Sequence, residues 1–195
     1  GIALGEGARD AEELLRNADV AMYLAKSQGK GRLAFYEQDQ HEELLRRAEL
    51  MSDLRDAVTE EQFVVHYQPI VALGSGRVVG MEALVRWAHP RRGLLAPREF
   101  IDLAEQSGLI VPIGRLVLIE ACRQARRWQA SRPTEPPMAI SVNVSGRQLD
   151  SPGLADAVRE ALEQSGLEPA HLVLELTESL LVEEPRHTVT LLRPL

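Results

Sequence analysis

The chain has 195 residues, of which 45% are hydrophobic, 26% charged and only 4% aromatic. This balance excludes wholesale disorder, and a core built from Leu, Val, Ile and Ala favours layered α/β or helical packing. The formal net charge of −7 argues against a protein that coats nucleic-acid polymers, because such binding needs clustered Lys and Arg. The single cysteine, Cys122, excludes an internal disulfide and suits the cytoplasm. No apolar run approaches the roughly 20 residues that span a bilayer.

Both ends of the sequence look like interior segments. The first residues, Gly1 to Leu4, have the pattern of the middle of a strand. The last ten residues form an apolar-periodic helical pattern that stops without a Gly or Asn cap. We therefore expect the sequence to be a piece of a longer protein.

The first 60 residues predict two helices and a short strand. Apolar residues at helical spacing indicate a helix over 8–28, which Gly29 ends, and a strand over 32–36 follows. A second helix is expected over 40–59, with one apolar stripe and an opposite face rich in Glu, Arg and Asp. It is either a solvated connecting helix or a signalling coiled-coil seam, and the seam would need more length than this.

The pattern changes at residue 62 to a strand over 62–73, interrupted by Pro69, and a second strand over 78–87. Between them, Gly74-Ser75-Gly76 superficially resembles part of a dinucleotide-binding fingerprint. That motif needs a helix after its glycines, whereas a strand follows here. We interpret these glycines as a hairpin turn.

After Pro90, strands alternate with helices, which indicates βαβ units and a parallel sheet. The runs at 138–144 and 171–177 are almost continuously apolar, as in strands buried on both faces. The natural architecture is an open, partial (β/α) barrel. The expected elements are helices over 97–107 and 110–130, a Pro-rich loop over 133–137, a strand over 138–144, a helix over 152–165, a strand over 171–177 and a helix over 185–195.

Three polar residues interrupt the apolar strands where functional groups of a barrel gather, at the carboxyl ends. They are Glu82, Asn143 and Glu175. Taken singly, each glutamate has the alternative of a salt bridge or a helix cap, and Asn143 that of a turn or cap hydrogen bond. Taken together, two carboxylates and an amide oxygen are hard ligands of the kind that Mg²⁺ or Mn²⁺ takes.

The same region resembles the EAL domain, a family that hydrolyses cyclic di-GMP to the linear dinucleotide. The resemblance covers roughly residues 50–195, and it is specific because several motifs occur in the family's order. These motifs are Tyr67-Gln68-Pro69-Ile70, Glu82-Ala83-Leu84-Val85-Arg86-Trp87, Pro97-Arg98-Glu99-Phe100-Ile101, Ala104-Glu105-Gln106-Ser107-Gly108, Ser141-Val142-Asn143-Val144-Ser145 and Glu175-Leu176-Thr177-Glu178-Ser179.

The resemblance implies roles for individual residues. Glu82, Asn143 and Glu175 would be ligands of two Mg²⁺ or Mn²⁺ ions, and Gln68, Leu84 and Arg86 would contact the cyclic dinucleotide. Glu82 would also be catalytic, together with Glu178, which would brace a loop over the site or would be an ordinary first-turn helix carboxylate. The family's further metal-binding aspartates would lie beyond Leu195, so we expect this stretch alone to be inactive.

The upstream part resembles the end of a GGDEF (diguanylate cyclase) domain. The matching segments are Gly1-Ile2-Ala3, Ala18-Asp19-Val20-Ala21-Met22-Tyr23, Ala25-Lys26 and Gly29-Lys30-Gly31-Arg32. The family's usual Gly-Arg-Asn is replaced by residues that include Lys30 and Gly31. Lys26 and Lys30 would be phosphate contacts of this remnant, and GTP would bind only to the intact domain.

The sequence thus predicts a GGDEF remnant over 1–37, a linker helix over 38–59 and the first half of an EAL-type, TIM-like barrel over 60–195. The resemblance implies a cyclic di-GMP phosphodiesterase, and the alternatives are a degenerate domain that only senses cyclic di-GMP and an α/β domain without a ligand. It also implies a homodimer through the EAL domain. The full-length protein would lie in the cytoplasm or be anchored to the membrane by a region outside this sequence.

Overall fold

The computed structural model describes residues 1–4, 10–27, 31, 33–36, 38–133 and 136–176. The chain forms two compact units, Gly1–Ser52 and Asp53–Leu195, which are described separately. The boundary between them falls inside helix α2 (Gln38–Thr59).

The first unit contains helix α1 (Ala11–Ser27). The carboxylate of Asp10 accepts a hydrogen bond from the Glu13 backbone N–H at 2.8 Å, which caps the amino end of the helix. The expected strand over 32–36 is reduced to a single parallel bridge between Ile2 and Phe35. A lone bridge lacks the second and third hydrogen-bonded neighbours that turn an extended segment into a strand.

The carboxyl end of α2 stops in a left-handed residue, Glu61, whose φ is +54°. The backbone N–H of Gln62 reaches back to the carbonyl of Ala57 at 3.1 Å, which satisfies one of the last carbonyls of the helix. This type of helix end usually has glycine at the left-handed position, because a Cβ there meets the following carbonyl.

The second unit is built on a mixed sheet with the strand order β1-β2-β4-β5, and β3 pairs with β2 beside that path. The pairs β1–β2 and β2–β3 are antiparallel, whereas β2–β4 and β4–β5 are parallel. The strand bounds are β1 (Phe63–Val71), β2 (Val78–His89), β3 (Gly93–Leu95), β4 (Ala139–Val144) and β5 (Leu172–Leu176). This is the parallel α/β order that the sequence predicts, with a hairpin at its start.

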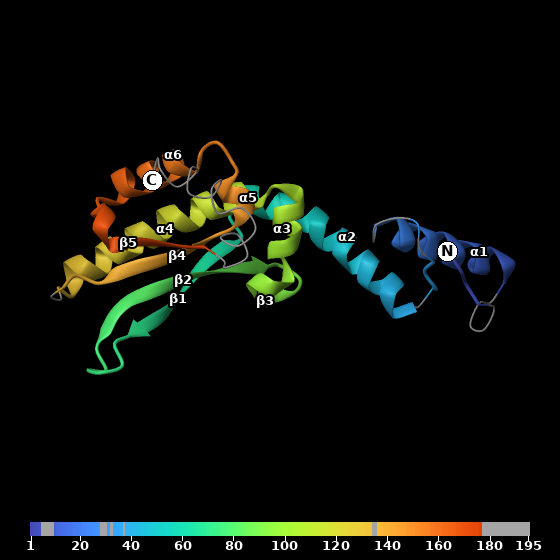
Figure 1. Ribbon diagram of the computed structural model, residues 1–195, viewed down its shortest axis with the longest axis horizontal. Coiled ribbons are helices and arrows are strands. Elements are labelled where there is room, and N and C mark those ends of the chain that lie inside the picture. Colours follow the sequence, from blue (N-terminus) through green and yellow to red (C-terminus); the bar gives the residue numbers. More distant parts are fainter. Residues whose placement is uncertain (5–9, 28–30, 32, 37, 134–135, 177–195) are drawn as a thin grey trace. The chain divides into compact units, whose positions relative to one another are not determined.

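Helices α4 (Ile110–Ser131) and α6 (Leu154–Ser165) lie together over one face of this sheet (Figure 1). The core between the sheet and these helices consists of aliphatic side chains. None of the helices in the described ranges is both long and apolar enough to cross a membrane. At one end of the core, the rings of Phe63, Trp87 and Phe100 lie within 6 Å of each other, at centroid distances of 5.7–5.9 Å. Three of the eight aromatic residues of the chain thus pack together where β1, β2 and the start of α3 meet.

Several elements differ from the sequence-based expectations. The helix expected over 97–107 is divided at Phe100 into a 3-10 turn (Pro97–Glu99) and α3 (Ile101–Ser107), because the Phe100 ring turns into the core and its backbone leaves helical geometry. Strand β3, the short helix α5 (Gly146–Leu149) and a 3-10 turn (Pro169–His171) were not predicted. The helix expected over 185–195 lies outside the described residues.

The expectation that both apolar strands are buried on both faces is confirmed only for most of β4. Ile140, Ser141 and Val142 are buried in succession, but Val173 in β5 is 43% exposed. In the described part of the chain, β5 ends the strand order and no helix covers the face on which Val173 lies. The apolar sequence of β5 therefore does not mean that this strand is buried on both faces.

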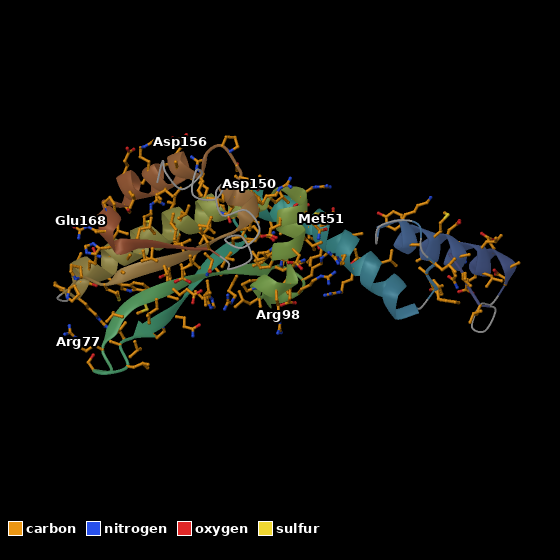
Figure 2. The ribbon with its side chains drawn as sticks, viewed as in Figure 1. Met51, Arg77, Arg98, Asp150, Asp156 and Glu168 are labelled. Atoms are coloured by element: carbon orange, nitrogen blue, oxygen red, sulfur yellow. The ribbon has the colours of Figure 1, made fainter. Side chains whose placement is uncertain are left out.

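The glycine pair does form a hairpin turn. The backbone N–H of Gly76 donates to the carbonyl of Ala72 at 2.8 Å, and Gly76 has a φ of +68°, which favours glycine. Figure 2 shows Arg77 at the tip of this hairpin, remote from the helices. The turn carries no helix at its glycines and therefore cannot form a dinucleotide-phosphate cradle.

Replacing Glu61 by glycine should stabilise the second unit. A left-handed non-glycine residue costs about 1 kcal/mol, so Glu61→Gly should raise the thermal midpoint by about 2–4 °C. The matched control is Glu60→Gly, since Glu60 has a negative φ and glycine there should lower the midpoint. A differential scanning calorimetry trace in which both variants lose stability equally would contradict this interpretation of the helix end.

Candidate functional site

The candidate polar residues share one face of the sheet. In the strand register, Gln68 lies opposite Glu82, and Asn143 lies beside Glu175. Glu82 is paired with Ser141, which is two residues before Asn143 on the same strand. Because side chains alternate along a strand and paired residues project to the same side, all four side chains project from one face. This is the face opposite to α4 and α6.

Two of these side chains are in direct contact. The amide Nδ2 of Asn143 donates a hydrogen bond to Oε1 of Glu82 at 2.7 Å, across 61 positions of sequence. The parallel pairing of β2 with β4 creates this contact, because it sets Glu82, in the middle of β2, beside the carboxyl end of β4, where Asn143 lies. The structure thus brings Glu82 and Asn143 together, and Glu175 is next to Asn143 in register.

The donor set suits a hard divalent cation. The bond between Asn143 and Glu82 uses the amide N–H, so the amide oxygen is the atom that a cation would take. Within the described residues, no group of three or more His, Cys, Asp or Glu side chains converges. The site there consists of two carboxylates and one amide, a set of oxygen ligands typical of Mg²⁺ or Mn²⁺ and unsuited to a soft metal.

Leu84 and Arg86 extend the same face of β2 beyond Glu82, since they follow it at alternate positions. A guanidinium NH of Arg86 donates to the carbonyl of its neighbour Val85 at 2.8 Å. This bond orients the side chain and uses one of its five N–H donors. The remaining fork has the geometry that binds phosphate oxygens.

A cavity of about 620 Å³ lies between strands β2 and β4 and helices α3 and α4. Its wall includes Leu84 and Asn143, and apolar residues of α3 and α4 such as Ile101 and Ile113 complete it. Leu84 and Asn143 are the two predicted site residues that reach it. A pocket of this size, with mostly apolar walls and a few polar groups at one end, can hold a flat heterocyclic ring.

The sequence reasoning assigned no role to the residues at the polar rim of the cavity, which come from the segment after β4. Ser145 begins helix α5 with a capping box, in which its hydroxyl accepts from the Gln148 N–H at 3.3 Å and Gln148 Oε1 accepts from the Ser145 N–H at 3.0 Å. Arg147 lies on the same turn and lines the cavity. The Ser-x-x-Gln pattern was the available signal for this helix.

Two buried titratable side chains on the helix side of the sheet are unsuited to chemistry at neutral pH. Burial, with the charge of Glu120, raises the pKa of Tyr67 to about 12, and its ring packs edge-on against Trp128 on the helix face. Burial raises the pKa of the Cys122 thiol to about 11. Both groups remain neutral, so nucleophilic chemistry by the single cysteine is excluded.

The remaining predicted residues stay predictions. Lys26 lies exposed on α1 in the first unit. Lys30 and Glu178 lie outside the described residues.

The geometry agrees with a family comparison. Residues 51–195 match the EAL domain model. The chain belongs to the EAL domain family. Its mixed α/β sheet accordingly belongs to that TIM-barrel-like fold.

Named relatives support the assignment. The chain is 44% identical, over its full length, to the bifunctional diguanylate cyclase/cyclic di-GMP phosphodiesterase MucR of Pseudomonas aeruginosa. It is 39% identical over 94% of its length to the cyclic di-GMP phosphodiesterase PdeR of Escherichia coli K12. It spans only 28% and 27% of the lengths of these two proteins.

Among solved structures, the chain resembles the PaMucR phosphodiesterase in complex with c-di-GMP. The TM-score is 0.69 at 46% identity, covering 74% of this chain and 57% of that one.

Removing one charge should weaken cation binding without disturbing the fold. Glu82→Gln keeps the size of the side chain and an oxygen that can accept from Asn143. It should weaken Mn²⁺ binding by more than the roughly tenfold that loss of an outer-shell partner costs. Isothermal titration calorimetry with Mn²⁺ measures this, with the exposed Glu163→Gln on α6 as the matched control. Unchanged Mn²⁺ affinity in Glu82→Gln would contradict the site.

Proposed function

We propose that this chain is part of a cyclic di-GMP phosphodiesterase, and that Glu82, Asn143 and Glu175 hold Mg²⁺ or Mn²⁺ at its active site. The observation that carries the proposal is the 2.7 Å contact between Glu82 and Asn143, with Glu175 next in register, in a chain of the EAL family. A divalent cation bound there would activate a water and offset the charge that develops on the phosphodiester.

The chain's own residues supply binding and orientation. Arg86 would pair with a phosphate through its planar fork, and Gln68, beside Glu82 in register, would hydrogen-bond the sugar-phosphate ring. Leu84 faces the cavity, which would take one of the two guanine bases. Glu178 would complete the catalytic group as the residue that braces a loop over the site.

The upstream unit would be the end of a GGDEF domain in a tandem protein, with residues 38–59 as the linker. The match to a bifunctional cyclase/phosphodiesterase supports this, because it extends over the residues before position 51 as well. Lys26 and Lys30 would contact phosphate there, and GTP would require the intact domain. We further propose that the catalytic region is cytoplasmic and dimerises through the EAL domain. The 195 residues alone would not hydrolyse cyclic di-GMP.

The decisive experiment is a hydrolysis assay on the full-length protein with cyclic di-GMP and Mn²⁺, with the linear dinucleotide quantified by chromatography. We expect turnover that Glu175→Gln reduces by about 100-fold or more, comparable to the loss of a key electrostatic group in other active sites. The matched control is Glu168→Gln, an exposed carboxylate at the amino end of β5, which should keep full activity.

Two outcomes would overturn the proposal. Binding of cyclic di-GMP without turnover, in the presence of Mn²⁺, would establish the sensor alternative. Absence of both binding and turnover would leave the α/β domain without this ligand.

A further inference from the structure

A second group of polar contacts lies at the end of β2, away from the candidate cation ligands. The carboxylate of Asp53 in α2 accepts hydrogen bonds from His89, the last residue of β2, and from Arg91 in the following turn. The distances are 3.0 Å from His89 Nε2 and 2.8 and 2.9 Å from Arg91 Nη2. We refer to these three residues as the Asp53 cluster.

The histidine of this cluster is held in one orientation. Its side chain is fully buried, and its ring lies 4.8 Å from that of Trp87. The Arg91 backbone N–H donates to His89 Nδ1 at 3.1 Å, so Nδ1 is the acceptor of the ring. Nε2 therefore carries the hydrogen and donates it in the hydrogen bond to Asp53. The ring therefore joins the carboxylate on one side to the turn after β2 on the other.

The donors around Asp53 stabilise the charged form of its carboxylate. Burial by itself would raise the pKa of Asp53, but the hydrogen bonds and charges of Arg91 and His89 outweigh it and hold that pKa below its ordinary value. The charged form is thus favoured by its partners, and removal of Asp53 would leave a buried imidazole N–H without its acceptor.

The cluster holds the carboxyl end of β2 together with the buried Trp87 ring and the pairing with β3. The parallel pairing of β2 with β4 ends at Ala83, and pairing with β3 begins at Trp87. Leu84, Val85 and Arg86 lie between these two anchors, with only β1 hydrogen-bonded to them in the described structure. The position of Leu84 and Arg86 therefore depends on how firmly the end of β2 is held.

The turn that contains Arg91 also leads to the wall of the cavity. It continues through β3 to Pro97 and Ile101, which line the cavity together with Leu84. Movement of this turn would change both the phosphate-facing arginine and the pocket beside it. Glu82, in contrast, lies on the part of β2 that is paired on both sides, with Gln68 and Ser141.

We propose that Asp53, His89 and Arg91 are positioning residues that align Leu84 and Arg86 for the cyclic dinucleotide, so that helix α2 sets substrate affinity without affecting the cation ligands. This inference rests on the proposed function for its ligand. Asp53 is the first residue of the second unit, and Leu54 and Ala57 bury the same helix end in it. A change imposed on α2 from upstream would reach β2 through this carboxylate.

The test compares Asp53→Ala and the milder Asp53→Asn with Asp56→Asn, an exposed aspartate one turn further along α2. In the full-length protein, the dissociation constant for cyclic di-GMP is measured by calorimetry in EDTA, which removes turnover and cations from the readout. We expect Asp53→Ala to weaken binding about tenfold, as misplaced binding groups do, and Asp53→Asn to weaken it less. Asp56→Asn should bind like the wild type.

Kinetics with Mn²⁺ separate positioning from general instability. The KM for cyclic di-GMP should rise in the Asp53 variants, while the Mn²⁺ concentration for half-maximal activity stays unchanged. A lower kcat at unchanged KM is the result that a smaller folded fraction would give, and it would overturn the inference. If Asp53→Ala does not fold, the same measurements on Asp53→Asn decide the question. If Asp53→Asn and Asp53→Ala bind cyclic di-GMP with wild-type affinity, the positioning inference is overturned and the phosphodiesterase proposal is not affected. If the wild-type protein binds cyclic di-GMP but does not hydrolyse it, only the phosphodiesterase proposal is overturned.

Discussion

Strand β2 pairs in parallel with β4 only from Gly80 to Ala83, and the arrangement of the candidate site depends on this short pairing. It brings Glu82, in the middle of β2, to Asn143 at the carboxyl end of β4, from distant parts of the sequence. The close approach of the two strands has a steric requirement as well. A Cβ on Gly80 would lie 3.1 Å from the carbonyl oxygen of Ala139, so a side chain there would require β4 to shift by a few tenths of an ångström. The glycine thus supports the site from a position that carries no chemistry.

The two faces of the sheet in the second unit have different roles. One face is apolar and is covered by α4 and α6, which are joined at their surface by the ion pair of Arg115 with Glu160. The other face carries the acids, the amide and Arg86, and the cavity opens where Leu84 and Asn143 meet α3 and α4. Because alternate residues of one strand serve both purposes, Trp87 anchors β2 in the core while Arg86 beside it faces the site. A strand that is firmly packed on one side can hold polar groups in place on the other.

The sequence predicts the parts of this structure that depend on local pattern. The alternation of apolar strands and helices identifies the parallel α/β order, and polar residues inside apolar strands identify Glu82, Asn143 and Glu175. The cavity and the Asp53 cluster could not be predicted in this way, because both arise from packing between segments. Asp53 appears in the sequence as one of many acidic residues on the polar face of a helix, and only the tertiary contact with buried His89 distinguishes it. Strand β3 is too short for its three residues to show a period. The break in the helix at Phe100 has the same origin, since the burial of its ring overrides a helical pattern.

The most direct measurement of whether this edge of the sheet is a cation site is anomalous X-ray diffraction at the manganese edge from crystals of the protein grown with Mn²⁺. If the three strands present their oxygens as described, the anomalous peaks will lie within bonding distance of the Glu82 carboxylate, with the Asn143 and Glu175 oxygens bound to the same ions. Peaks located elsewhere, or Glu82 still hydrogen-bonded to Asn143 with no ion beside it at saturating Mn²⁺, would show that the contact is structural and that this edge holds no cation.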